Sequence, residues 1–125
     1  MKLLLDTHAL LWALSEPQRL APEARRRLEQ AENVVFVSAV CAWEMEIKRA
    51  LGKLDAPDDL PEQMERNRMF ELPVHLRHIR RLRKLPTLHR NPFDRMLIAQ
   101  ALADDLTLVT RDQRILAYPV KHLVC

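Results

Sequence analysis

Leu3-Leu4-Leu5-Asp6, near the start of the chain, is a short apolar run that ends in a carboxylate. A strand buried on both faces of a parallel sheet has this composition. In open α/β sheets, ligands bind in the crevice beyond the carboxyl ends of the strands, which is where Asp6 is expected. Asp6 and Thr7 would also serve as a cap for the next helix, so this stretch alone leaves both roles open.

Strand-like and helix-like segments alternate along the rest of the chain. Apolar and β-branched runs predict further strands at residues 34–37, 70–72, 106–110 and 120–124. Helices are predicted over residues 9–15, 22–31, 39–51, 62–69, 74–85 and 91–104 from their caps, prolines and apolar spacing. This alternation predicts an α/β fold with a mostly parallel sheet covered on both faces, formed by residues 1–125 as one domain.

Composition excludes several classes of function. The 125 residues include 20 Lys plus Arg and 17 Asp plus Glu, a formal net charge of +3, and a single glycine. One glycine cannot build a dinucleotide-binding loop or a P-loop. Cys41 and Cys125 form no metal or redox motif, and we expect reduced thiols in a cytoplasmic protein. No apolar run is long enough to span a membrane, and Asp6 and His8 interrupt the apolar start before it resembles an export signal.

Glu44 falls at the edge of an apolar arc in the helix predicted over residues 39–51. The arc is formed at helical spacing by Val40, Trp43, Ile47, Ala50 and Leu51. A carboxylate that faces a core is costly unless it is paired or bound to a cation. Glu44 therefore indicates either a metal site or a buried ion pair with an arginine.

Asp94 and Asp112 repeat this pattern. Asp94 lies inside the apolar arc of the helix that follows Asn91, although an acid in the first turn also suits the helix dipole. Asp112 follows the strand predicted at residues 106–110, where an ordinary turn aspartate is the alternative. Asp104 and Asp105, at the other end of their helix, are interpreted as solvated loop acids.

The strand ends and helix starts should meet at one edge of the sheet, which would gather Asp6, Glu44, Asp94 and Asp112. Acids so close together raise one another's pKa, and divalent cations remove the repulsion. A site of carboxylates alone suits Mg²⁺ or Mn²⁺ better than Zn²⁺. The chemistry indicated is metal-assisted hydrolysis of a phosphodiester.

Four segments resemble, in the same order, the motifs of PIN-domain ribonucleases, specifically the VapC-type toxins of type II toxin–antitoxin systems. They are residues 4–12 (LLDTHALLW), 38–54 (SAVCAWEMEIKRALGKL), 89–101 (HRNPFDRMLIAQA) and 106–112 (LTLVTRD). The resemblance implies a PIN-like three-layer α/β/α sandwich with a mostly parallel sheet and Mg²⁺- or Mn²⁺-dependent endoribonuclease activity. It also implies an antitoxin partner that inserts a segment into the site, and a homodimer.

The resemblance carries roles over to matching positions. It implies that Asp6, Asp94 and Asp112 hold the metal, and that Glu44 supports a second metal or orients the attacking water. Thr7 and Thr110 would fix the carboxylates by hydrogen bonds. Similar sequences commonly have Asp at the position of Asn91, so Asn91 is left out of the metal set and weaker metal binding is expected.

Basic residues offer a surface for RNA. Residues 66–90 contain eight Lys or Arg and one acid, a balance that attracts a nucleic-acid backbone and that an ordinary solvated helix would also show. Arg95 and Arg111 flank the acids and are candidates for RNA contact or for an ion pair with Glu44. Trp12 and Trp43 stand among apolar neighbours, which predicts core positions rather than base stacking.

Two other functions remain open at this point. One is a phosphatase with Asp6 as covalent nucleophile, but that class expects a second Asp two residues later, where the chain has His8. The other is a catalytically weak RNA- or partner-binding module on the same fold. Asn91 favours such a module, whereas the presence of all four acids argues against it.

Overall fold

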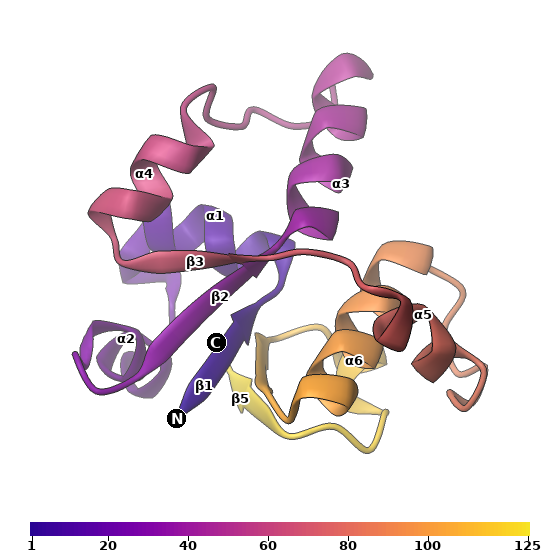
Figure 1. Cartoon of the computed structure of the whole chain (residues 1–125). Helices are drawn as coiled ribbons and strands as arrows, with labels where there is room; N and C mark the ends of the chain where they lie inside the picture. The colour runs from indigo at the N-terminus through magenta and orange to yellow at the C-terminus, as the bar shows by residue number, and fades with distance from the viewer.

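A computed structural model describes residues 1–125 and contains one five-stranded sheet (Figure 1). All the strand pairs are parallel, in the order β3-β2-β1-β4-β5. The strands are β1 (Lys2–Leu5), β2 (Val34–Ser38), β3 (Met69–Leu72), β4 (Thr107–Thr110) and β5 (His122–Val124). The central strand β1 is the one predicted from its leucines, and Leu3, Leu4 and Leu5 are each 0% exposed.

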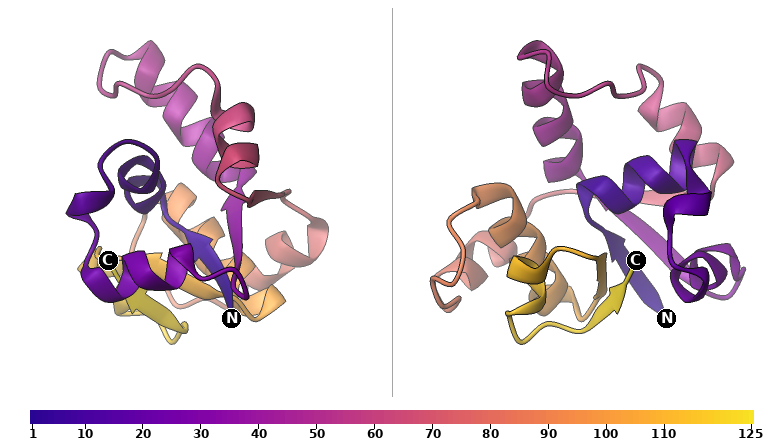
Figure 2. Two further views of the ribbon diagram at one scale, coloured as in Figure 1. Left: turned by 90° about the vertical axis from the view of Figure 1, so that its left-hand side faces the viewer. Right: turned by 180° about the vertical axis from the view of Figure 1, so that it is seen from behind.

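Seven α-helices connect these strands, together with a short 3-10 turn at Pro17–Arg19. They are α1 (Thr7–Ser15), α2 (Pro22–Glu29), α3 (Ala39–Ala50), α4 (Leu60–Arg66), α5 (Leu76–Leu82), α6 (Pro92–Asp104) and α7 (Gln113–Leu116). Figures 1 and 2 show α1 and α2 on one face of the sheet and α5 and α6 on the other. The predicted three-layer α/β/α sandwich is therefore confirmed, and its sheet is wholly parallel.

Local sequence explains most of the helix boundaries. Ser38 caps α3 by accepting a hydrogen bond from the Val40 backbone N–H at 3.1 Å. Gly52 follows the end of α3 with a φ of +68°, a left-handed conformation that glycine adopts without a side-chain clash. Proline at the first position opens α2 and α6, as predicted. The short helix α7 was not predicted, because four residues are too few to show a helical period.

The prediction that Trp43 lies in the core is wrong. The buried face of α3 consists of Val40, Cys41, Glu44 and Met45. Trp43, Ile47 and Leu51 are instead 61%, 38% and 63% exposed, so they form a separate apolar stripe at the surface. The apolar arc drawn from the sequence merged these two faces. Trp12 is half-buried and packs against the core, as expected.

The interpretation of Asp104 as a solvated acid is also wrong. Its carboxylate accepts two hydrogen bonds from Arg77, at 2.9 and 3.0 Å, and contacts Nε2 of His78 at 2.9 Å. His78 is 0% exposed. Beside it, Gln100 donates a hydrogen bond to the Pro73 carbonyl and accepts one from the Ser38 hydroxyl. These contacts lower the pKa of Asp104 to about 2, the Arg77 hydrogen bonds having the largest effect. Asp105 is exposed, as predicted.

Candidate functional site

The acidic site lies where the strand order reverses in the sheet, between β1 and β4. β1 and β4 are parallel neighbours, and Asp6 and Asp112 follow their carboxyl ends. The Thr110 hydroxyl joins the two segments: it donates a hydrogen bond to Asp6 Oδ2 at 2.5 Å and accepts one from the Asp112 backbone N–H at 3.1 Å. Such a reversal in strand order opens a crevice in which ligands of α/β proteins bind.

None of the helices has the length and hydrophobicity that a membrane span requires.

Asp6 fills the capping role that its sequence left open, and it lies directly after the carboxyl end of β1. It is buried, and its Oδ1 accepts a hydrogen bond from the Ala9 backbone N–H at 2.8 Å, so it caps α1. Burial raises the pKa of Asp6 above its ordinary value, and the negative charge of Asp94 adds to the increase. The hydrogen bonds from Thr110 and Ala9 act in the opposite direction. Asp6 is thus a carboxyl group at a strand end whose charged form is disfavoured by burial and by the charge of Asp94.

Glu44 is buried in α3 and reaches the same region. Its Oε1 accepts a hydrogen bond from the Thr7 hydroxyl at 2.6 Å, and its Oε2 pairs with Lys48 Nζ at 2.8 Å. The ion pair considered as the alternative to a metal site is present, but its partner is a lysine one helical turn later and not an arginine. The spacing of four residues between Glu44 and Lys48 is visible in the sequence and would have identified this pair.

Asp94 stands in the first turn of α6, which Asn91 caps by accepting hydrogen bonds from the Phe93 and Asp94 backbone N–H groups at 2.9 and 3.3 Å. Its Oδ2 lies 2.8 Å from Nε2 of His89. Burial raises the pKa of Asp94, and the charges of Glu44 and Asp112 raise it further. His89 comes from the loop before α6, and its contact with Asp94 leaves no periodic signal in the sequence.

Asp112 is the most accessible of the four acids and is held by Arg114. The Arg114 side chain contacts Asp112 Oδ1 and Oδ2 at 3.2 and 3.0 Å, and its backbone N–H donates to Oδ1 at 2.9 Å. The hydrogen bond from the Arg114 side chain lowers the pKa of Asp112. Asp112 therefore caps α7 and carries its own cation.

A buried thiol lies among these acids. Burial raises the pKa of Cys41 to about 12, and the negative charges of Asp6, Glu44 and Asp94 contribute to the increase. The Cys41 thiol donates a hydrogen bond to the Leu5 carbonyl at 3.6 Å. Three of the four predicted acids thus act on one buried group, so the fold brings them into one electrostatic neighbourhood. Both cysteines are free.

The chemistry of this donor set fits Mg²⁺ or Mn²⁺, which prefer carboxylate oxygens. No three of the chain's His, Cys, Asp or Glu side chains are arranged to hold one ion. Glu44, Asp94 and Asp112 each contact a side-chain nitrogen instead, from Lys48, His89 and Arg114. A metal at this site would have to displace such nitrogens from the carboxylate oxygens.

The two arginines considered for RNA contact make intramolecular hydrogen bonds. Arg95 Nη1 donates to the Pro86 carbonyl at 2.9 Å and to the Tyr118 hydroxyl at 3.0 Å. Arg111 donates to the backbone carbonyls of Arg19 and Cys125. The Arg111 guanidinium also lies 4.3 Å from the ring centroid of Trp12. Neither arginine pairs with Glu44, so that alternative is wrong.

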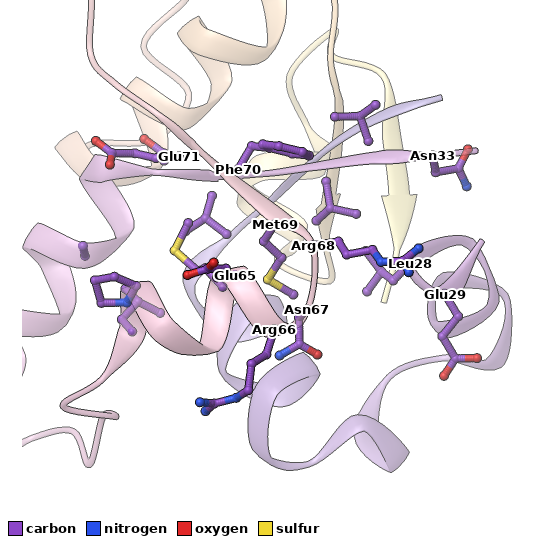
Figure 3. A pocket seen from close by; sticks show the side chains of 18 of the residues that line it. Leu28, Glu29, Asn33, Glu65, Arg66, Asn67, Arg68, Met69, Phe70 and Glu71 are labelled. Carbon is purple, nitrogen blue, oxygen red and sulfur yellow. The ribbon is translucent and has the colours of Figure 1, made fainter. Parts of the chain in front are cut away.

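Two hollows border these elements. A small one of about 290 Å³ is lined by Asp6, His8, Trp12, Arg111, Asp112 and Arg114, so it opens onto the acidic site. A larger one of about 1130 Å³ lies between α2, α4 and the β2–β3 part of the sheet (Figure 3). Its lining is mostly apolar around Met64, Met69 and Phe70, and it contains none of the four acids. The large groove is therefore a surface of different chemistry.

Solved structures with low sequence identity share the fold. One is a chain of VapBC2 from Rickettsia felis, in a structure bound to a promoter DNA fragment. It is 15% identical with a TM-score of 0.75, over 100% of this chain and 99% of that chain. A chain of DNA-bound VapBC from Salmonella typhimurium is 17% identical with a TM-score of 0.70, over 99% and 98%. A chain of FitAcB from Neisseria gonorrhoeae is 22% identical with a TM-score of 0.56, over 97% and 96%.

No curated protein matches the chain. The family model of the PIN domain matches residues 3–121, a span that includes all four acids and both threonines that hold them. The order of the sequence motifs and the parallel sheet agree with this match. The chain therefore belongs to the PIN domain family.

Proposed function

We propose that this PIN-domain protein is a metal-dependent endoribonuclease and the toxin of a toxin–antitoxin pair. One observation carries the proposal: Asp6, Glu44, Asp94 and Asp112 come from separate segments and lie near enough for their charges to interact. Burial and this repulsion raise the pKa of Asp6 and Asp94. Such a cluster is costly without cations and suits a divalent metal. The fold shared with VapBC complexes supports the toxin assignment.

Each side chain has a role in this proposal. Asp6, Asp94 and Asp112 would hold Mg²⁺ or Mn²⁺, and Glu44 would support a second ion or orient the attacking water. A divalent ion bound there supplies the Lewis acid for phosphodiester hydrolysis. Thr110 and Thr7 fix Asp6 and Glu44 through hydrogen bonds of 2.5 and 2.6 Å, which keeps the carboxylates oriented.

The test is cleavage of a structured RNA by the purified full chain, freed of any co-purifying partner, with added Mn²⁺ or with EDTA. We expect internal cleavage with Mn²⁺ and none with EDTA. Equal cleavage in both samples would indicate a contaminating nuclease and would overturn the proposal. RNA binding without cleavage in either sample would favour the catalytically weak binding module. The match to the PIN domain leaves the phosphatase interpretation without support.

A basic face on and after α5 supports RNA as the substrate. Arg80, Arg83 and Lys84 are exposed and form no ion pair, whereas Arg77 is occupied by Asp104. Replacing all three with Gln should weaken RNA binding and reduce the slope of log affinity against log salt by about 2, since each single-strand phosphate contact contributes about 0.7. Fluorescence anisotropy at several salt concentrations in EDTA measures both quantities.

The matched control removes Arg25, Arg26 and Arg27 from α2, where all three pair with glutamates. It lowers the net charge by the same amount and should leave the salt slope close to that of the native chain. Equal effects of the two triple variants would show that net charge, rather than the α5 face, attracts RNA.

We propose that the large groove docks one part of the antitoxin, which the family resemblance implies inserts another segment into the acidic site. Figure 3 shows Met69 of β3 on the side of α4, where Glu65 and Arg66 lie, and the Phe70 ring on the other side of β3. An apolar channel with a charged rim fits the apolar side of an amphipathic segment. The VapBC complexes that share the fold support a protein partner of this kind.

We also propose a homodimer formed through the exposed stripe of Trp43 and Ile47 on α3 and Leu51 directly after it. Exposed apolar side chains at this spacing form a contiguous patch of the kind found at subunit contacts. Light scattering should give twice the chain mass of 14.7 kDa. Leu51→Glu should reduce it to the mass of one chain, and an unchanged mass would place the contact elsewhere.

The free buried thiols fit a cytoplasmic location.

A further inference from the structure

Arg114 differs from the other arginines beside the acidic crevice. Its guanidinium contacts Asp112 at 3.2 and 3.0 Å and bonds to no backbone carbonyl, and the side chain is 65% exposed. It lines the same hollow as Asp6. Arg95 and Arg111, in contrast, are tied to backbone carbonyls. Arg114 is thus the arginine at this site that is free to change partner.

Asp112 does not depend on the Arg114 side chain for its orientation. Its Oδ1 accepts the hydrogen bond of the Arg114 backbone N–H at 2.9 Å, and its own N–H donates to the Thr110 hydroxyl at 3.1 Å. The carboxylate therefore stays in place when the guanidinium swings away. A solvent-exposed ion pair contributes little to stability, so its rupture is easily offset.

We infer that Arg114 is an internal counter-ion of Asp112, which holds the carboxylate in the metal-free protein and turns to an RNA phosphate once Asp112 binds a metal. The inference rests on the proposed function. The guanidinium opposes a divalent cation in two ways, because it repels positive charge and occupies both oxygens of Asp112. Once released, its planar fork of donors matches the oxygens of a phosphate.

The test compares the native full chain with Arg114→Gln and Arg114→Lys. Free Mn²⁺, followed by electron paramagnetic resonance during titration, reports metal affinity without any cleavage reaction. We expect Arg114→Gln to bind Mn²⁺ about tenfold more tightly, since one opposing charge is gone. Arg114→Lys keeps the charge and should remain near the native affinity. Circular dichroism checks that each variant is folded.

RNA affinity provides the second measurement. With Ca²⁺ in place of Mn²⁺, Arg114→Gln should bind a fluorescein-labelled single-stranded RNA about fivefold more weakly, because a charge-assisted phosphate contact is lost. The matched control is Arg25→Gln, which removes an exposed arginine that pairs with Glu29 on α2. Arg25→Gln should change neither the Mn²⁺ affinity nor the RNA affinity by more than about twofold.

Unchanged Mn²⁺ affinity in Arg114→Gln would overturn the counter-ion role. RNA binding that is no weaker than in Arg25→Gln would overturn the phosphate contact. The proposed function fails in a different way, because the native chain would then neither bind Mn²⁺ nor cleave RNA. A native chain that does both, beside variants that behave identically, rejects the inference about Arg114 alone.

Discussion

Asp6→Asn should abolish RNA cleavage while leaving the protein at least as stable as the native chain. A carboxylate oxygen that would hold the metal is replaced by a neutral amide, and we expect a rate loss on the order of a thousandfold or more. The asparagine keeps an acceptor for the Ala9 backbone N–H, which preserves the cap of α1. Gel assays of RNA cleavage with Mn²⁺ measure the loss.

The expected stability of the Asp6→Asn variant follows from the direction in which the pKa of Asp6 is shifted. Burial raises the pKa of Asp6, so the charged form is less favourable in the folded protein than in the unfolded chain. Removing that charge should therefore maintain or raise the melting temperature. Asp105→Asn is the matched control, because Asp105 is exposed and pairs with Lys121 alone. Full cleavage activity in Asp6→Asn would contradict the assignment of this residue.

Asp104→Asn should destabilise the fold by about 1–2 kcal/mol at neutral pH. Hydrogen bonds from Arg77 and His78 lower the pKa of Asp104 from 3.8 to about 2. Its side chain is 16% exposed, but that of Arg77 is 56% exposed, so solvent screens part of the effect. His78 is fully buried, and the variant would leave its Nε2 facing an altered partner.

The pH dependence of this effect has a defined direction. A carboxyl group whose pKa is lowered on folding stabilises the protein above its unfolded pKa, and the contribution disappears as the pH falls through the folded value of about 2. Urea denaturation should therefore show the full difference between native and Asp104→Asn proteins near neutrality and a shrinking difference below about pH 4. A difference that is independent of pH would contradict the ionic origin.

The sheet and the convergence of the acids were accessible from sequence because their causes are local. A leucine run that ends in Asp6, and a threonine-rich strand followed by Asp112, each combine burial with a polar terminus. Parallel topology then brings these ends to one edge. Asn91 and Pro92 likewise predict the start of α6, and this start places Asp94 in the first turn of the helix.

What the sequence did not reveal depends on contacts between distant segments. The rotation of α3 about its axis is set by its packing against β2, α1 and α6, so Trp43 could not be assigned to the surface from periodicity. Asp104 was misread because His78, its buried partner, lies 26 residues earlier in the chain. Arg95 presented the same difficulty, since its partner Tyr118 follows 23 residues later.

The hydrogen bond between Thr110 and Asp6 spans 104 residues, nearly the whole chain, and this has a consequence for synthesis on the ribosome. Asp6 is synthesised well before β4, the strand that orients it and brings Asp112 alongside. Chains fold from the N-terminus as they are synthesised, so a partly synthesised chain contains Asp6 but not the assembled acidic site. Under the proposed function, a nascent copy would not cleave the RNA that surrounds it until β4 has been synthesised.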